Sequence, residues 1–209
     1  GLLPLIGGRL FCEKRIDLDA ASRNSLFQGI SMKTRPCLII GASGDIGAAI
    51  AHRLLEQGRK VALTHSPRSG PRASLADLER DKGKWYSVDV KDAKAVADMI
   101  AAVEADFGAV PDLVYSAGIT NDGSISLITD EMWDGAMATN LSGAFYCVRA
   151  LSRSLMAAGN GRIVFIGSLT GSKGNSGQLA YAATKGGLEA MCRVIALEMG
   201  RFGTTCKAC

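Results

Sequence analysis

Three side chains in the C-terminal third of the sequence are of the types needed to move a proton. Tyr181 and Lys185 are four residues apart, so on a helix they share one face, one turn apart. A phenol titrates at about pH 10, and a neighbouring ammonium group favours the phenolate and lowers its pKa. Ser168 follows the apolar run 163–166 and could aim its hydroxyl at the same place. These residues fit an acid–base site, although Tyr-x-x-x-Lys by itself is also common in ordinary helices.

The segments that must position these residues alternate between short apolar runs and stretches of helical periodicity. This alternation predicts a single α/β domain with a Rossmann-type, doubly wound parallel sheet in three αβα layers. Strands are predicted at 37–40, 61–64, 85–88, 113–115 and 163–166, and helices at 46–58, 74–80, 96–107, 130–158 and 181–199.

Composition narrows the classes of protein that this chain can be. Its 209 residues suit one domain, and its 24 basic residues are dispersed, so a net charge of +4 does not indicate nucleic-acid binding. No stretch approaches the ~20 apolar residues that a membrane span needs. Of six cysteines, only Cys206 and Cys209 form a Cys-x-x-Cys pair, and no histidine is near them, so we expect no metal site. The cysteine pattern favours a reducing compartment, and we expect a cytoplasmic protein.

A glycine-rich turn lies between the first predicted strand and the first predicted helix. In a dinucleotide-binding fold such a turn needs glycines for a tight bend, for close approach of a pyrophosphate and for helix packing. The helix that follows would offer unpaired N–H groups to the phosphates. The alternative is a turn with a purely structural role. The predicted cofactor contacts in this turn are Gly41, Ser43, Gly44, Asp45, Ile46 and Gly47.

The end of the second predicted strand bears on which cofactor is bound. An Asp or Glu at this position usually binds a free ribose 2′-hydroxyl, whereas an Arg suits a 2′-phosphate. The sequence here is Thr-His-Ser-Pro-Arg, with His65 and Arg68 and no acidic residue. This favours NADP(H) over NAD(H), unless Arg68 is only a solvated loop residue.

With these features in place, residues 33–203 resemble the short-chain dehydrogenase/reductase family. The glycine turn, Asn140 and the Ser168, Tyr181 and Lys185 set occur in the family's order, and the gap from Ser168 to Tyr181 has its spacing. Within the family, the motifs are most similar to the branch that reduces 3-oxoacyl groups carried on acyl carrier protein. The motifs that carry this similarity are Ala117–Thr120, Thr139–Ser142, Gly161–Ile163, Gly167–Ser168 and Gly174–Gln178.

The resemblance implies a role for each of these residues. Tyr181 would give a proton to the substrate carbonyl oxygen, and Lys185 would lower the pKa of Tyr181 and bind the nicotinamide ribose. Ser168 would orient the carbonyl, and Asn140 would hold a water that relays protons to Lys185. Without the family, Asn140 reads equally as a helix-kink residue bonded to backbone. The resemblance also implies cofactor contacts at Asp89, which matches an adenine-binding position, and at Val90, Ser116, Ala117 and Gly118.

The sequence departs from the family pattern in three places. Asp45 replaces the middle glycine of the turn, which also fits the Gly-x-x-Gly-x-x-Gly of the extended, epimerase-like branch; the short length and the Asn140 motif argue against that branch. Ser116 replaces an asparagine and offers fewer donors. Residues 204–209 do not resemble the family's next strand, so we expect a truncated domain in which 163–166 is an exposed sheet edge.

These observations predict a domain organisation and leave three functions open. Residues 1–31 are expected to be an extension, 32–203 an NADP-binding reductase domain, and 204–209 a tail outside the family pattern. The leading function is reduction of a β-keto thioester on acyl carrier protein. The alternatives are a reductase or dehydrogenase of a small ketone or secondary alcohol, and an inactive chain that binds cofactor. The family resemblance also implies a homo-oligomer, a dimer or tetramer formed through the helices at 130–158 and 181–200.

Overall fold

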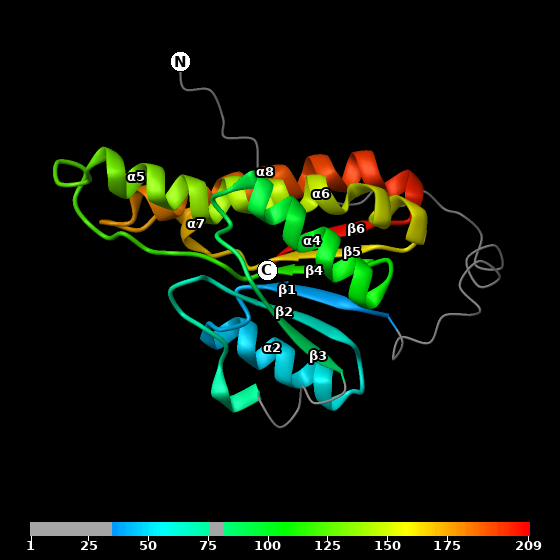
Figure 1. Ribbon diagram of the computed structural model, residues 1–209. Coiled ribbons are helices and arrows are strands. Elements are labelled where there is room, and N and C mark those ends of the chain that lie inside the picture. Colours follow the sequence, from blue (N-terminus) through cyan, green and yellow to red (C-terminus); the bar gives the residue numbers. More distant parts are fainter. Residues whose placement is uncertain (1–34, 76–81) are drawn as a thin grey trace, which may run out of the picture. The chain divides into compact units, whose positions relative to one another are not determined.

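The computed structural model describes residues 35–75 and 82–209. Within this part, six parallel strands form one sheet in the order β3-β2-β1-β4-β5-β6 (Figure 1). The order reverses between β1 and β4, which is the arrangement of a doubly wound fold. The predicted fold class is therefore confirmed. The strands are β1 Cys37–Ile40, β2 Val61–His65, β3 Gly83–Ser87, β4 Asp112–Tyr115, β5 Arg162–Phe165 and β6 Thr205–Ala208.

Helices cover both faces of the sheet because alternate strand residues are apolar on each side. Helix α2 lies on one face, and α4, α6 and α8 lie on the other (Figure 1). The long helical stretch predicted at 130–158 consists of α5, a π-helical segment at Met137–Ser142, and α6. The helices are α2 Asp45–Glu56, α4 Ala93–Phe107, α5 Asp130–Ala136, α6 Gly143–Ala158, α7 Thr170–Lys173 and α8 Leu179–Met199, with short 3₁₀ turns at Ala73–Leu75 and Gly200–Phe202.

Individual residues account for the start of α4 and the end of α6. The Asp92 carboxylate accepts hydrogen bonds from Lys94 N and Ala95 N, and so caps α4. Helix α6 ends at Ala158, and the next residue, Gly159, has a φ of +69°, the left-handed conformation that glycine adopts without strain. None of the described helices is long and apolar enough to cross a bilayer.

The C-terminal residues form a strand, which corrects the expectation that 163–166 is a sheet edge. β6 pairs with β5 in parallel register, with Cys206 opposite Ile163 and Ala208 opposite Phe165. Cys206 and Ala208 pack against the helical core, and Thr205 and Lys207 face the other side. A four-residue strand built on two small apolar side chains carries little apolar signal, and for this reason the sequence pattern missed it.

A buried ion network lies at the end of the sheet where β1, β2 and β4 begin. The Arg35 and Arg59 guanidinium groups each lie 2.5 Å from a different oxygen of the Asp112 carboxylate, and all three residues are under 10% exposed. Arg59 also donates to Arg35 O, and Arg35 to Asn160 O. Because each oxygen has its own partner, the carboxylate is well compensated in the core. The predicted extension at residues 1–31 lies outside the described residues, as does most of the predicted helix 74–80.

Candidate active site

The glycine turn has the close backbone contacts that a dinucleotide-binding turn requires. Gly41 has a φ of +83°, and a Cβ there would lie 2.7 Å from Ala117 N. A Cβ on Gly47 would lie 2.2 Å from Gly41 O, so only glycine lets α2 start this close to the turn. Gly44 is the N-cap of α2 and supplies no side chain to its first N–H groups. The start of α2 therefore offers free donors and a partial positive charge to an anion.

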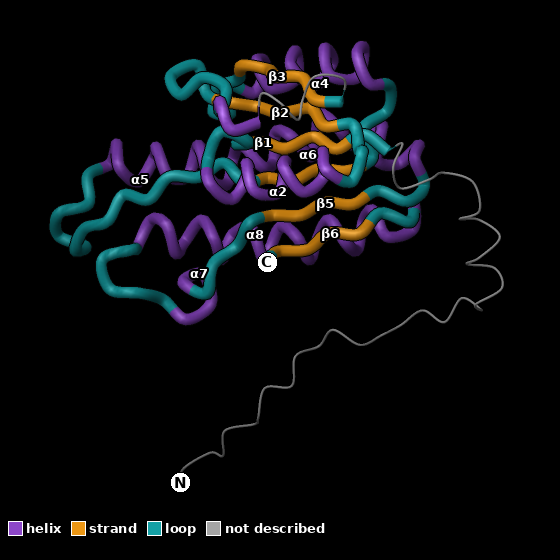
Figure 2. Tube along the Cα trace, turned by 90° about the horizontal axis from the view of Figure 1, so that it is seen from below, coloured by secondary structure: helices purple, strands orange, loops and turns teal. Residues whose placement is uncertain are grey.

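A cavity of about 530 Å³ lies beside this turn, at the carboxyl ends of the strands. This is the switch point where ligands bind in doubly wound sheets. Helices α5 and α7 extend beyond the same end of the sheet, on the left of Figures 1 and 2. Ten of the predicted cofactor residues line the cavity: Gly41, Ser43, Gly44, His65, Arg68, Asp89, Val90, Ser116, Ala117 and Gly118.

Two other predicted contacts, Asp45 and Ile46, are not among the residues that line the cavity. The Asp45 side chain is 92% exposed and pairs with Arg72 at 2.7 Å. Arg72 also donates to Ser43 O at 3.1 Å, so this ion pair ties the glycine turn to the loop after β2. Ile46 is 55% exposed. The Asp45 substitution thus leaves the cavity lining unchanged and adds a contact outside it.

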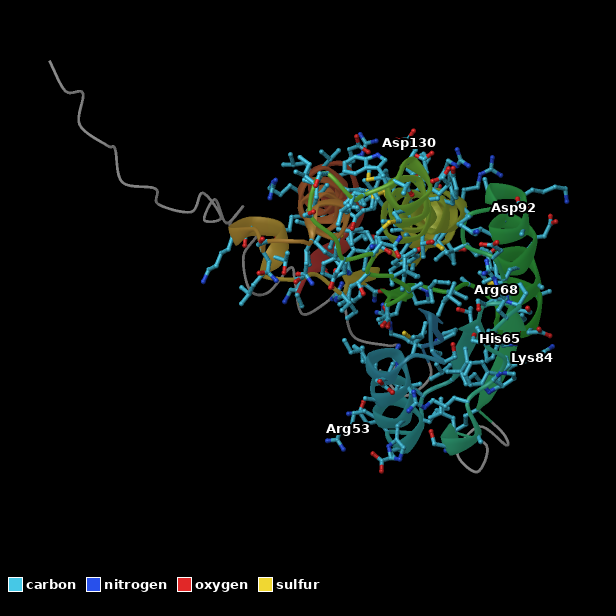
Figure 3. All side chains as sticks on the ribbon, turned by 90° about the vertical axis from the view of Figure 1, so that its left-hand side faces the viewer. Arg53, His65, Arg68, Lys84, Asp92 and Asp130 are labelled. Atoms are coloured by element: carbon cyan, nitrogen blue, oxygen red, sulfur yellow. The ribbon has the colours of Figure 1, made fainter. Side chains whose placement is uncertain are left out.

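The loop after β2 supplies the polar groups at one end of the cavity. Ser69 Oγ lies 3.2 Å from Ser43 Oγ and 3.1 Å from Ser66 Oγ. His65 ends β2 and Arg68 lies in the loop that follows; both line the cavity (Figure 3). The His65 ring packs at a tilt on Trp85, with the ring centroids 5.9 Å apart. Among the described residues, no carboxylate pairs with Arg68. Three hydroxyls and one exposed guanidinium form a pocket end suited to a phosphate.

Asn140 lies in the π-helical segment, fully buried, with its side chain bonded in three directions. Its Oδ1 accepts from Ile119 N at 2.8 Å, and its Nδ2 donates to Ile119 O at 2.9 Å and to Thr184 Oγ1 at 3.1 Å. Thr184 in turn donates to Tyr181 O at 2.8 Å. Asn140 therefore links the loop after β4 to the helix that carries Tyr181. π-Helical segments occur frequently at functional sites.

Lys185 and Tyr181 meet on α8 as their spacing predicts. Lys185 Nζ lies 5.2 Å from the centre of the Tyr181 ring and donates to Ile166 O at 2.6 Å. Lys185 is 5% exposed, and burial lowers the pKa of its ammonium group. A Cβ on Gly118 would lie 3.9 Å from Lys185 Nζ, so this lysine reaches the wall of the cavity.

Ser168 follows β5 and is half-buried where α7 meets α8. Its Oγ accepts from Thr170 N at 3.2 Å. Gly171 and Gly186 bring the two helices into backbone contact, because a Cβ on Gly171 would lie 2.7 Å from Gly186 N and 2.9 Å from the Cβ of Lys185. Ser168 is thus next to the helix turn that bears Lys185. Of the four predicted catalytic residues, Asn140 and Lys185 lie next to Gly118 in the cavity wall, since a Cβ on Gly118 would lie 3.5 Å from Asn140 Oδ1 and 3.9 Å from Lys185 Nζ. Tyr181 is connected to them through Lys185, and none of the four is among the residues that line the cavity itself.

Comparison with known proteins decides the family. The model of the short chain dehydrogenase family matches residues 35–209, and so continues into the residues expected to fall outside the family pattern. The chain belongs to this family. It is therefore an oxidoreductase that acts on CH–OH and C=O groups.

Relatives of this short chain dehydrogenase include 3-oxoacyl-[acyl-carrier-protein] reductases. FabG of Escherichia coli K12 is 38% identical over 168 residues, which are 80% of this chain and 68% of that protein. FabG of Salmonella typhimurium LT2 is 36% identical over 84% of this chain and 72% of its own length. Nodulation protein G of Azospirillum brasilense is 36% identical over 85% and 73%. The predicted resemblance to the 3-oxoacyl reductase branch is confirmed.

Several residues of this dehydrogenase site were not predicted from the sequence. Thr184, which lies on α8, accepts a hydrogen bond from Asn140 and donates one to Tyr181 O. The only sequence feature that could have indicated this role is its position next to Lys185 in a predicted helix. Ser66 and Ser69 meet only because the loop folds back on itself, and sequence spacing does not show this. Lys91, whose Nζ lies 3.6 Å from the Asp89 carboxylate, adds a second cation to the cavity wall.

Proposed function

We propose that the chain reduces a β-keto thioester, a 3-oxoacyl group on acyl carrier protein, with NADPH as the reductant. The observation that carries the proposal is the placement of Asn140 and Lys185 next to Gly118, which lines the 530 Å³ cavity, with the Tyr181 ring centre 5.2 Å from Lys185 Nζ. Similarity to the 3-oxoacyl reductases supports the substrate class. The cavity, the start of α2 and the turn at Gly41 and Gly47 fit a dinucleotide.

The residues present fit NADP(H) at both ends of the cavity. The N–H groups at the start of α2 would hold the pyrophosphate. Ser43, Ser66, Ser69 and Arg68 would hold a ribose 2′-phosphate, because they bring hydroxyl donors and a cation and no carboxylate. Asp89 and Val90 line the wall expected to face the adenine. When bound, the cofactor supplies the hydride that is added to the carbonyl carbon.

The protein's own residues would handle the proton. Tyr181 donates its phenolic proton to the carbonyl oxygen, so that addition of hydride and proton together gives a hydroxyl. The nearby Lys185 ammonium stabilises the phenolate that remains. Ser168 donates a hydrogen bond that orients the carbonyl, and Asn140 fixes the loop wall against α8 and supports the path that returns a proton to Lys185.

Turnover assays with matched variants test this proposal. The full chain is incubated with NADPH or NADH and with acetoacetyl thioesters or a panel of simple ketones, and cofactor oxidation is followed. We expect NADPH oxidation with the thioesters, its loss in Tyr181→Phe, and its retention in Tyr86→Phe, which removes a hydroxyl that donates to Asp106 away from the site. Turnover of ketones but not thioesters would support the alternative substrate, and tighter binding of NADH than NADPH would contradict the cofactor assignment.

Binding without turnover would instead support the inactive, cofactor-binding chain. Isothermal titration with NADPH therefore accompanies the assays. Tyr181→Phe should bind NADPH close to wild type, because the phenol acts on the substrate carbonyl, whereas Arg68→Ala should weaken NADPH more than NADH. Equal weakening of both cofactors would show that Arg68 does not bind the 2′-phosphate.

The assembly and location remain part of the same proposal. We propose a homo-oligomer, a dimer or tetramer, in the cytoplasm. Helices α6 and α8 present exposed apolar side chains, with Phe145 45%, Val194 52% and Leu197 83% exposed. Such a surface is typical of a subunit interface. Sedimentation velocity at several protein concentrations tests it, and a monomer throughout would contradict it.

A further inference from the structure

A fully buried tyrosine at the end of β4 is bonded to the π-helical segment that carries Asn140. Tyr115 is 1% exposed, and its hydroxyl donates to Thr139 O at 2.5 Å. Burial raises the pKa of this phenol well above its ordinary value, so it stays protonated and can donate at any pH at which the protein works. The acidity of Tyr115 plays no part in the chemistry proposed above, so its hydroxyl needs another explanation.

The absence of a side chain at Gly143 leaves room for the Tyr115 hydroxyl. A Cβ on Gly143 would lie 2.3 Å from Tyr115 Oη, and 3.0 Å from both Val90 O and Val90 Cβ. Gly143 is the first residue of α6, directly after the π-helical segment. The phenol therefore occupies space that any other residue at 143 would fill. Its hydrogen bond satisfies the Thr139 carbonyl at the place where the helix changes its hydrogen-bond register.

Hydrogen bonds hold the two ends of the stretch 115–119 against two consecutive residues of the π-helical segment, Thr139 and Asn140. Tyr115 begins the stretch 115–119 and bonds to Thr139, while Ile119 ends it and is bonded twice by the Asn140 side chain. Residues 116–118, between these ends, and Ile119 itself line the cavity. Asn140 continues the connection through Thr184 to Tyr181 O. These hydrogen bonds together connect β4, the cavity wall, the π-helical segment and α8.

We infer that Tyr115 is a positioning residue, whose hydroxyl holds the π-helical segment in the register that places Asn140 against Ile119 and the helix bearing Tyr181 and Lys185. The effect on catalysis rests on the proposed function, whereas the effect on Asn140 does not. Removing the hydroxyl takes away the hydrogen bond that ties Thr139 O to β4, so this point of the π-helical segment loses its link to the sheet and its backbone can change position. Such a change moves Asn140.

The test compares Tyr115→Phe with wild type and with Tyr86→Phe by NMR of the ¹⁵N-labelled chain. The signals followed are the Ile119 backbone amide and the Asn140 side-chain amide, together with a distant strand amide, Val61 N, which bonds to Lys82 O. In Tyr115→Phe we expect the first two to shift and to exchange with solvent about tenfold faster or more, with Val61 unchanged. Tyr86→Phe should leave all three unchanged.

Two further measurements separate positioning from general stability. If NADPH-dependent turnover is found, Tyr115→Phe should lower kcat about tenfold with little change in the KM for NADPH, because the loop geometry changes and the phosphate contacts do not. Gly143→Ala should perturb Asn140 strongly in the wild-type background and less in Tyr115→Phe, where the clashing hydroxyl is absent.

The NMR test of Tyr115 does not depend on whether the proposed function is correct. If wild type has no turnover, the NMR comparison still decides whether Tyr115 places Asn140. Unchanged Ile119 and Asn140 signals in Tyr115→Phe would overturn the inference. So would equal acceleration of exchange at all three amides, since that is the signature of a lower global stability alone.

Discussion

Replacing Gly47 by alanine should damage both the fold and the cofactor site, although Gly47 lies inside a helix. In an ordinary helix this change stabilises by about 0.5–1 kcal/mol. Here the new Cβ would lie 2.2 Å from Gly41 O, 2.9 Å from Gly41 C and 3.0 Å from Ala42 Cα, all of them backbone atoms that cannot rotate away. Optimal carbon contacts are about 3.5–4.0 Å. Overpacking of this kind costs about 1–3 kcal/mol or more, so we expect net destabilisation.

Gly44→Ala is the matched control three residues earlier. Its Cβ would meet only Gly41 O, at an ordinary 3.5 Å, and its φ of −76° is open to alanine. Losing a glycine N-cap should cost only about 0.5 kcal/mol. Urea unfolding followed by circular dichroism gives both free energies, and titration calorimetry gives the NADPH affinity. Since Gly44 lines the cavity, its methyl should weaken NADPH binding with the fold intact, whereas Gly47→Ala should lose both. A Gly47→Ala chain as stable as wild type would refute the reasoning.

Three other changes test separate parts of the structure. Asp112→Asn leaves Arg35 and Arg59 buried without their carboxylate and should lower the free energy of unfolding by about 3–5 kcal/mol in urea titrations, whereas Asp106→Asn, at an exposed pair with Lys84, should change it little. Thr184→Val keeps the side-chain volume but leaves Asn140 Nδ2 without its Thr184 acceptor, so we expect a loss of about 1–3 kcal/mol in stability and a lower kcat. Burial lowers the pKa of Lys185 from about 10.5, so burying the ammonium costs stability in full below the lowered pKa, and this cost falls as the pH rises from the lowered pKa to about 10.5. Wild type should therefore gain stability relative to Lys185→Met between neutral and alkaline pH, and a constant difference would contradict the shift.

The strands that the sequence predicted are those with continuous apolar runs. β1 and β4 are buried at every position, and in β5 the alternate residues Ile163 and Phe165 are buried, whereas Arg162 is exposed and Val164 is half-buried. The carboxyl ends of parallel strands lie at one edge of the sheet, which is why the glycine turn after β1 and Ser116 after β4 lie next to each other. β6 has no such run, because Thr205 and Lys207 are exposed.

The π-helical segment was hidden for a different reason. An apolar stripe reports which face of a helix is buried and is insensitive to whether a carbonyl bonds four or five residues ahead. The register at Met137–Ser142 depends on partners far away in the sequence, among them the Tyr115 hydroxyl, 24 residues before Thr139. The clusters at Ser43, Ser66 and Ser69 and at Asp45 and Arg72 are equally non-local, so spacing predicted the contacts within one helix and missed those between loops.

The strand that was not predicted bears directly on the candidate site. Lys185 is anchored on Ile166 O, and Ser168 lies two residues further along the same chain. That chain is held on one side by Ile166 N, which donates to Tyr115 O of β4, and on the other by Gly167 N, which donates to Cys209 O beyond β6. The end of β5 is therefore fixed from both neighbouring strands. In the proposed mechanism, the Tyr181 phenol acts beside the Lys185 ammonium, and the ammonium is held by Ile166 O. Strand pairing at the C-terminal edge of the sheet would therefore help to set the geometry of that proposed acid–base pair.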